Sequence, residues 1–187
     1  MVILMMSRKE ALKLLDENIS NNNLKKHMVA VSAIMQGLAR KFGEDEEVWA
    51  LMGLLHDIDY ERVEGNMDRH GLVSAEMLKD VFPEEFLHAI RAHNARTNVK
   101  AESLLDKALL SADAVSGLIV AAALVMPNKR LSEVRVETLK TKFKDKSFAR
   151  GVERGQIEAC EEMGLKFEEF LEIALKALQG VSDQLGL

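Results

Sequence analysis

EDEEVWALMGLLHDIDYE, residues 44–61, combines an acidic start, an apolar periodicity and a polar end. Four acidic residues at 44–47 suit the positive N-terminus of a helix. Apolar residues then recur at the i, i+3, i+4 and i+7 positions of one helix face: Val48, Leu51, Met52 and Leu55. His56 continues that face from Met52. The segment therefore predicts an amphipathic helix that carries its final His56-Asp57 pair toward the core.

The same helical periodicity extends over the rest of the 187 residues. Hydrophobic residues make up 48% of the chain, aromatic residues only 5%, and there are two prolines, which favours helices over strands. Further helices are predicted at about 7–19, 24–42, 71–81, 83–93, 103–125, 132–142, 148–163 and 167–178. We find no domain boundary, because 127–130 is typical of a loop within a domain. The fold class predicted is all-α, a single-domain helical bundle over residues 1–187.

Composition also limits the partners and the compartment. A net charge of −5 argues against a nucleic acid polymer as partner. The apolar start at 1–6 precedes Arg8 and Lys9, the wrong order for a secretory signal. Asp113 interrupts the apolar stretch 108–128, which favours a buried helix over a membrane span. The single cysteine, Cys160, excludes an internal disulfide and is predicted to be a buried or half-buried small side chain. We expect a cytoplasmic protein without a membrane partner.

Four of the five histidines continue apolar helix faces: His27, His56, His70 and His93. Asp113 lies four residues beyond Leu109 on the most apolar helix. A single inward histidine is usually a hydrogen-bonded core residue, but these four accompany two inward carboxylates. A buried carboxylate without a cation costs several kcal/mol, so a metal centre would satisfy the whole set. His88, beside charged residues, is predicted to be a solvated surface histidine.

The chain resembles the HD superfamily of metal-dependent phosphohydrolases. The resemblance rests on His27 in KKHMVAV, His56 and Asp57 in LLHDIDYE, and Asp113 in LLSADAVSG. It covers about 24–120, with a weaker echo in KSFARGVERGQIEAC, and we expect the C-terminal helices of 130–180 to pack on this region. It implies that these four residues bind one divalent metal ion, and that Asp57 can bridge to a second.

Two further histidines, His70 in DRHGLVSAEML and His93 in IRAHN, match positions that some subgroups of the family add. Many dinuclear phosphodiesterases of the family have another histidine where this chain has Asn94. The family's frequent lysine after the motif is also replaced, by Asp59 and Tyr60. These departures argue against cyclic-dinucleotide phosphodiesterase activity.

The predicted cofactor is Mn, Fe, Zn, Ni, Co or Mg, because imidazole and carboxylate donors suit several divalent ions. We predict one tight metal site and a second, weaker one at His70, His93 and Asp57. Asn94 or water would replace the missing histidine there. In the alternative reading, His70 and His93 line the pocket and donate hydrogen bonds to substrate.

The predicted activity is hydrolysis of a nucleotide or another small phosphorylated metabolite. Asp57, Asp59 and Glu61 are candidate catalytic residues that orient or deprotonate water, although Asp59 and Glu61 also fit solvated loop carboxylates. Asn94 is a candidate for substrate binding. Three basic residues of the helix predicted at 148–163 and its approach, Lys146, Arg150 and Arg154, follow an i, i+4, i+8 spacing that could meet phosphate oxygens. The same spacing fits one charged face of a surface helix.

Two other functions stay open at this point. The ligand order His, His-Asp, His, His, Asp also resembles that of the di-iron oxygenases among HD proteins. A non-catalytic metal-binding module is the other alternative, which a complete ligand set disfavours. The sequence does not indicate an oligomeric state.

Overall fold

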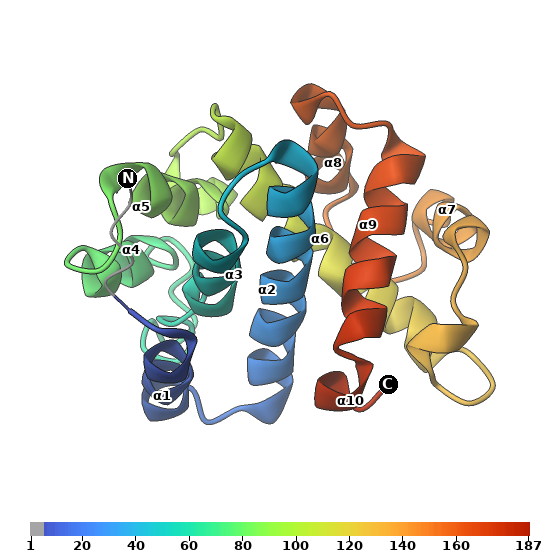
Figure 1. The fold of residues 1–187 in the computed structure, drawn as a ribbon, viewed down its shortest axis with the longest axis horizontal. Helices are drawn as coiled ribbons and strands as arrows, with labels where there is room; N and C mark the ends of the chain where they lie inside the picture. The colour runs from blue at the N-terminus through green and yellow to red at the C-terminus, as the bar shows by residue number, and fades with distance from the viewer. Residues whose placement is uncertain (1–5) are drawn as a thin grey trace.

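The computed structural model describes residues 6–187, and the segment 1–5, which includes most of the apolar start considered above, lies outside them. Within the described part, the chain is helical throughout and contains no strand, which confirms the all-α prediction (Figure 1). The helices are α1 Arg8–Asn18, α2 Asn22–Phe42, α3 Glu46–Leu55, α4 Leu72–Leu78, α5 Glu84–Ala92, α6 Leu104–Leu124, α7 Val136–Lys144, α8 Arg154–Glu158, α9 Phe167–Gly180 and α10 Ser182–Leu185. Three 3₁₀ turns, at Ala95–Thr97, Leu131–Glu133 and Ala159–Met163, connect them.

Helix α2 is the centre of the bundle and packs against α3, α6 and α9 (Figure 1). Its contact with α3 is close because Gly53 has no side chain. A Cβ atom at that position would lie 2.9 Å from the backbone of Ser32 on α2. The Ser32 hydroxyl in turn donates to the carbonyl of Ala50 on α3. The glycine thus lets the end of α3, with its His-Asp pair, lie directly against α2.

Helix α6 crosses behind α2 and α9 and contacts α5, α7 and α8 (Figure 1). It begins with a capping box in which Ser103 and Asp106 satisfy each other's backbone N–H groups. By length and composition α6 could cross a membrane, but 61% of its apolar window is buried inside the protein. It is therefore a core helix, as the sequence predicts, and the burial of Asp113's neighbours follows from that position.

The prediction of one helix over 148–163 is wrong. Residues 145–153 form turns, α8 covers only Arg154–Glu158, and a 3₁₀ turn follows. Ala149 has a positive φ of 45°, which a continuous helix does not allow. Cys160, at the end of this segment, is buried as predicted, and burial raises the pKa of its thiol to about 12.

The turns are held by one side chain, that of Arg154. Its guanidinium has five N–H donors, and each meets a backbone carbonyl. Nη1 donates to Ala149 and Val152 at 2.7 and 2.9 Å, Nη2 to Asp145 and Phe148, and Nε to Phe143 at 3.4 Å. We call this arrangement, residues 143–154, the Arg154 loop. The backbone closes around the guanidinium instead of forming a helix.

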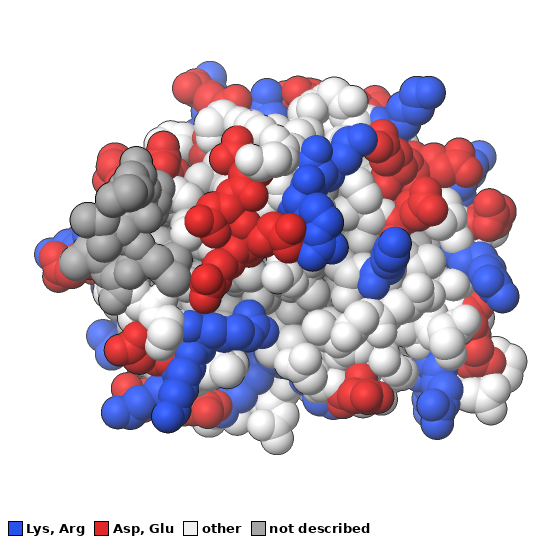
Figure 2. Space-filling model, viewed as in Figure 1, with Lys and Arg blue, Asp and Glu red and all other residues white. Residues whose placement is uncertain are grey.

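The face that presents α2 and α9 carries acidic and basic side chains intermixed (Figure 2). Arg40 pairs with Glu46, and Lys41 with Glu169. Exposed pairs of this kind contribute about 0–1 kcal/mol each. The stability of the fold therefore rests on its apolar core, in which large side chains such as Phe170, Ile34 and Leu54 are fully buried.

Candidate metal centre

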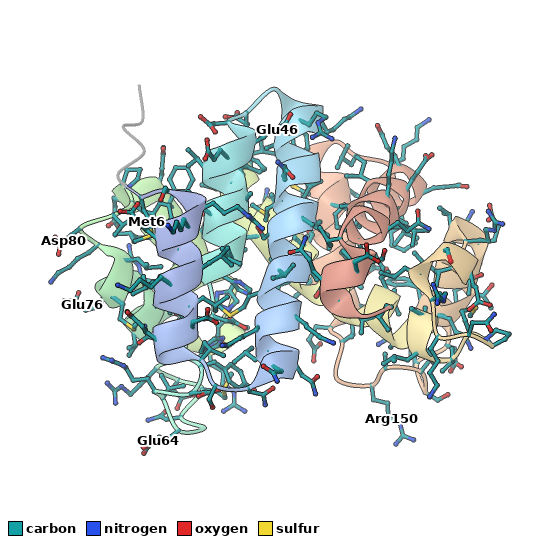
Figure 3. The ribbon with its side chains drawn as sticks, turned by 60° about the horizontal axis from the view of Figure 1, so that its bottom comes forward. Met6, Glu46, Glu64, Glu76, Asp80 and Arg150 are labelled. Atoms are coloured by element: carbon teal, nitrogen blue, oxygen red, sulfur yellow. The ribbon has the colours of Figure 1, made fainter. Side chains whose placement is uncertain are left out.

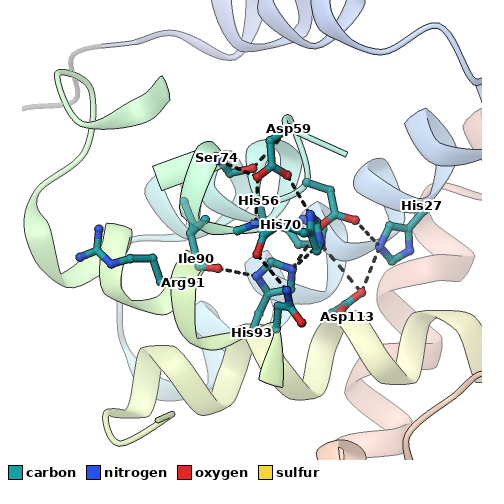
Figure 4. Close-up of polar contacts among 12 residues, drawn as sticks. His27, His56, Asp59, His70, Ser74, Ile90, Arg91, His93 and Asp113 are labelled. Atoms are coloured by element: carbon teal, nitrogen blue, oxygen red, sulfur yellow. Dashed lines mark hydrogen bonds and ion pairs between the residues drawn. The ribbon is translucent and has the colours of Figure 1, made fainter. Parts of the chain in front are cut away.

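Six side chains from five parts of the chain meet between α2, α3, α5 and α6 (Figure 4). Helix α2 contributes one histidine, the end of α3 the His-Asp pair, the connection to α4 a second histidine, the end of α5 a third, and the middle of α6 an aspartate. They are His27, His56, Asp57, His70, His93 and Asp113. The structure therefore brings together all the histidines and aspartates that were predicted to bind metal.

Asp57 lies at the middle of the cluster. Its Oδ1 atom is 3.2 Å from the Nε2 atoms of His56, His70 and His93. Its other oxygen, Oδ2, is 3.6 Å from Nε2 of His27. Asp57 thus contacts all four imidazoles and is shared between the His27–His56 group and the His70–His93 group.

Asp113 completes the cluster from the α6 side. Its Oδ1 atom lies 3.0 Å from Nε2 of His27 and 3.8 Å from Nε2 of His56. His93 and His70 also approach each other, with 3.1 Å between their Nε2 atoms. The ligand atoms of each of three triads, one of them His56, His93 and Asp113, lie within 4.8 Å of one another.

The second nitrogen of each imidazole, Nδ1, is held by an oxygen of the protein. Nδ1 of His56 and of His93 donates to a backbone carbonyl, Gly53 and Ile90 respectively. That of His70 contacts a carboxylate oxygen of Asp59 at 2.8 Å. That of His27 lies 3.2 Å from the Ser116 hydroxyl, which itself donates to the Asp113 carbonyl. Such partners fix both the orientation and the tautomer of metal-binding histidines.

These hydrogen bonds determine what the Nε2 atoms can do. With Nδ1 protonated, a neutral imidazole presents a lone pair at Nε2. Four lone pairs and two carboxylates then face one another, which is repulsive unless a cation lies among them. Nε2 of His56 and Oδ1 of Asp57 are buried without any hydrogen-bond partner among the described residues. The donor set therefore fits a metal ion.

The spacing of the donors fits as well. Neighbouring ligands at about 2.1 Å from an octahedral ion are separated by about 3.0 Å, close to the contacts of 3.0–3.2 Å at His27, Asp57 and His93. Histidine and aspartate are ligands that several first-row transition metals accept. The mixed nitrogen and oxygen donors therefore favour a transition metal over an ion that prefers only oxygen ligands.

The pKa values of the clustered histidines and aspartates are also shifted in the direction that favours positive charge in the cluster. Burial alone lowers the pKa of His27, but its hydrogen bonds to Asp113 and Asp57 raise that pKa to about 10. For His70, burial is likewise outweighed by Asp57 and Asp59, and the pKa rises to about 10. Burial raises the pKa of Asp57, yet the charge of His56 and the hydrogen bonds from the other imidazoles hold it well below its usual range. Protons occupy these nitrogens when no metal does.

Asp59 and Glu61 do not lie where their predicted catalytic role requires. Asp59 is fully buried, and its carboxylate accepts from His70 and from the backbone N–H groups of Gly71 and Ser74. Gly71 has a φ of +85°, and a Cβ there would lie 2.8 Å from the Ile90 carbonyl that holds His93. Asp59 therefore orients His70 and does not face the reacting space.

Glu61 connects two loops. Its carboxylate accepts from the backbone N–H groups of Ser20 and Asn21 and from the Ser20 hydroxyl, at 2.8–2.9 Å. The hydrogen bonds from Asn21 and Ser20 lower its pKa. Glu61 fastens the segment after α3 to the start of α2, so its contribution is structural.

Asn94 lies beside the cluster, but its amide is occupied by the backbone. Nδ2 donates to the carbonyls of Met67 and His70 at 2.6 and 2.9 Å, and Oδ1 accepts from the Arg96 N–H. The prediction of Asn94 as a replacement ligand therefore has no support in the geometry. Asn94 holds the 67–70 segment in place.

A cavity of about 760 Å³ opens over the cluster and contains His27, Asp57, His70, His93 and Asp113 in its wall. Sequence reasoning did not select four polar residues that also line it: Tyr60, Arg96, Glu153 and Gln156. Arg96 could have been selected from the sequence, because it lies only two residues beyond Asn94 and close to the metal-binding His93. Glu153 and Gln156 lie in KSFARGVERGQIEAC, the weaker echo of the family, but their place at the cavity depends on the Arg154 loop.

The three basic residues predicted to bind phosphate do not line this cavity. All the guanidinium donors of Arg154 are used within its own loop, Lys146 is exposed, and Arg150 points away from the bundle (Figure 3). They do not share a helix, so the spacing on which the prediction depended is absent. His88, as predicted, lies apart from the cluster, where its half-exposed ring contacts Asp106 at 3.1 Å.

Comparison with known proteins gives one match. The model of the HD domain family matches residues 24–118, which include all six clustered side chains. No curated protein and no solved structure matches the chain.

Proposed function

This chain belongs to the HD domain family of metal-dependent hydrolases, and we propose that it hydrolyses a phosphate ester of a nucleotide or another small phosphorylated metabolite. One observation carries the proposal. Four Nε2 atoms with fixed lone pairs and two carboxylates converge at the base of an open cavity large enough for a nucleotide. Such a site holds metal and still leaves one side accessible to substrate.

His27, His56, Asp57 and Asp113 would hold one divalent ion, and His70 and His93 would share Asp57 to hold a second. When bound, divalent ions of this kind lower the pKa of water and stabilise negative charge that develops on a phosphoryl group. Without metal, Asp57 and Asp113 would repel an anion. With metal bound, the cluster would carry positive charge and attract the phosphate group of a small substrate.

The protein's own groups then have distinct tasks. Asp59 and the Gly53 carbonyl keep His70 and His56 in the tautomer that leaves Nε2 unprotonated. The buried faces of α3 and α5 exclude water from the rear of the cluster, where His56 and His93 are 0% and 3% exposed. Among the described residues, the cluster opens into the cavity of about 760 Å³, so substrate would approach past Tyr60 and Gln156.

Elemental analysis of freshly purified protein, followed by a panel of phosphomonoesters and phosphodiesters with each metal, tests the proposal. We expect one to two metal ions per chain and hydrolysis of at least one ester that stops after chelation and resumes after metal addition. Bound metal with no hydrolysis of any ester would contradict it and leave a non-catalytic metal-binding module.

One observation also supports an oxygenase. Because Asn94 is occupied by the backbone, the cluster has six protein ligands and no seventh, which matches the ligand order of the di-iron oxygenases. Two irons per chain together with oxygen consumption, in place of ester hydrolysis, would establish that activity instead.

A further inference from the structure

The charges around the cavity are few and unequal. Among residues 6–187, Arg96 is the only basic side chain that lines the cavity. Apart from the two aspartates of the metal cluster, Glu153 is the one acidic residue in the wall within the described part of the chain. Beyond the metal cluster, the cavity therefore offers one positive and one negative side chain.

Arg96 is already shared with another group. Its Nη1 atom lies 3.8 Å from a carboxylate oxygen of Asp68, and the side chain is 66% exposed. A guanidinium in this state can meet one anionic or hydrogen-bonding group of a ligand, but water and Asp68 weaken its attraction for further charges. Arg96 alone cannot neutralise a chain of phosphates.

Glu153 is free to act on a ligand. It occupies the position before α8, yet its side chain makes no capping hydrogen bond, and it has no ion-pair partner within the described part of the chain. The backbone on both sides of Glu153 is held by hydrogen bonds. Arg154 closes the preceding loop, and the Gln156 carbonyl accepts from Ser111 on α6. The backbone therefore keeps this exposed carboxylate at the wall of the cavity, where it contributes a partly screened negative charge.

We propose that this cavity selects substrates with a single phosphate group and that Glu153 disfavours di- and triphosphates. This inference rests on the proposed hydrolase activity. Whichever phosphate reacts at the cluster, a polyphosphate places its other phosphates in the cavity, where Glu153 repels them and only Arg96 opposes that repulsion. The uncharged part of a monophosphate, such as a nucleoside, is not repelled by Glu153. The side-chain amide of Gln156 makes no hydrogen bond among the described residues, so it can donate to that part of the substrate or accept from it.

Hydrolysis of one nucleoside as its mono-, di- and triphosphate, repeated for several nucleosides, gives the first test. We expect the highest kcat/KM for the monophosphate. The preference should narrow as salt increases, because salt screens the repulsion. Hydrolysis of the triphosphates at equal or greater kcat/KM would overturn the inference while supporting the proposed hydrolase activity.

The variant Glu153→Gln identifies the residue responsible. It should improve kcat/KM for the triphosphate relative to the monophosphate by roughly threefold to tenfold, as expected for removing one partly screened charge. Glu158→Gln is the matched control, because Glu158 is an exposed acid at the far end of the same helix and does not line the cavity. An unchanged ratio in Glu153→Gln, or an equal change in Glu158→Gln, would overturn the assignment to Glu153.

Binding provides a readout that does not depend on turnover. Calorimetry with the metal-loaded protein would compare a nucleoside monophosphonate with its methylene-bridged diphosphonate, neither of which is hydrolysed. We expect the monophosphonate to bind more tightly to the parent and the difference to shrink in Glu153→Gln. Tighter binding of the diphosphonate by the parent, or binding of neither compound, would overturn the inference even if no ester had been hydrolysed.

Discussion

The metal cluster lies between helices and the Arg154 loop is partly exposed, and the hydrogen bonding of their polar groups is opposite. In the Arg154 loop, five donors of one guanidinium meet five carbonyls. In the cluster, the Nδ1 atoms are satisfied, whereas Nε2 of His56 and Oδ1 of Asp57 have no hydrogen-bond partner within residues 6–187. One arrangement is complete within the protein, and the other is complete only with a cation.

This difference separates structural from functional polar groups. Buried polar atoms nearly always have partners, so a group whose donors are all used stabilises the chain itself. Acceptors that are fixed facing one another repel each other, and a bound cation removes that repulsion. Arg154 belongs to the first kind and Asp57 to the second, although the sequence suggested a functional role for both residues.

The largest effect should come from Asp57→Ala, which removes the carboxylate shared by all four imidazoles. We expect metal content to fall to near zero and hydrolysis to the level of background, with helical content retained. Elemental analysis, activity and circular dichroism provide the measurements. His88→Ala is the control, because His88 lies outside the cluster. Full metal occupancy in Asp57→Ala would show that the cluster does not bind the metal.

A smaller loss of metal should follow from replacing both His70 and His93 by alanine. His27, His56 and Asp113 remain, so we expect metal content to fall from near two ions per chain to near one. Mass spectrometry under native conditions would resolve the two species. An unchanged metal content in the double variant, under metal-replete conditions, would leave only a pocket-lining role for these histidines.

Arg154→Ala should affect stability and leave the metal in place. Five carbonyls lose their donors, and we expect the free energy of unfolding to fall by about 2–4 kcal/mol. KM should rise, because Gln156 loses its fixed position in the wall of the cavity. Denaturant unfolding and elemental analysis are the measurements. Arg150→Ala, at an exposed position of the same loop, should change stability by less than about 0.5 kcal/mol. Equal effects of the two variants would contradict the structural role of Arg154.

The last prediction concerns the pH dependence of the metal-free protein. His27 and His70 have a pKa of about 10 in the fold and about 6.5 when unfolded, so their contribution to stability is complete below about pH 6.5 and is lost as pH rises through 10. The lowered pKa values of Asp57 and Asp113 act oppositely, and their contribution is lost below about pH 4. Stability should therefore be highest between about pH 4 and 6.5.

Urea unfolding of the chelated protein at pH 6 and pH 9.5 would check this dependence. A guanidinium remains charged over this range, so Arg154→Ala should lower the unfolding free energy by the same amount at both values. A metal-free parent that is more stable at pH 9.5 than at pH 6 would contradict the pKa shifts at the cluster.

Most of the fold could be predicted because local periodicity determines it. The apolar periodicity of 24–42, 44–61 and 83–93 indicated helices that the structure confirms as α2, α3 and α5. The helix expected over 148–163 failed for a physical reason. Gly151 and Gly155 lower the helix propensity of the segment. The guanidinium of Arg154 satisfies the carbonyls of Phe148, Ala149 and Val152 in place of the N–H groups that a helix would supply.

The members of the cluster could be predicted, whereas the roles of residues around them could not. His27 and Asp113 lie on apolar helix faces, so burial can be inferred from sequence. Asp59 and Glu61 were expected to be available for catalysis because they follow Asp57 directly. Their actual partners, Ser74 and Ser20, are distant in sequence, and no local pattern indicates such pairings.

The Ser116 hydroxyl that holds His27 belongs to a residue 89 positions further along the chain. No short piece of the polypeptide can therefore assemble the site during synthesis, and α2 and α6 must dock before a ligand pocket exists. In the docked bundle, the raised pKa values of His27 and His70 mean that protons on these imidazoles balance the carboxylates of the cluster before a metal ion binds. Loading the metal-free fold with metal is then an exchange of protons for the ion.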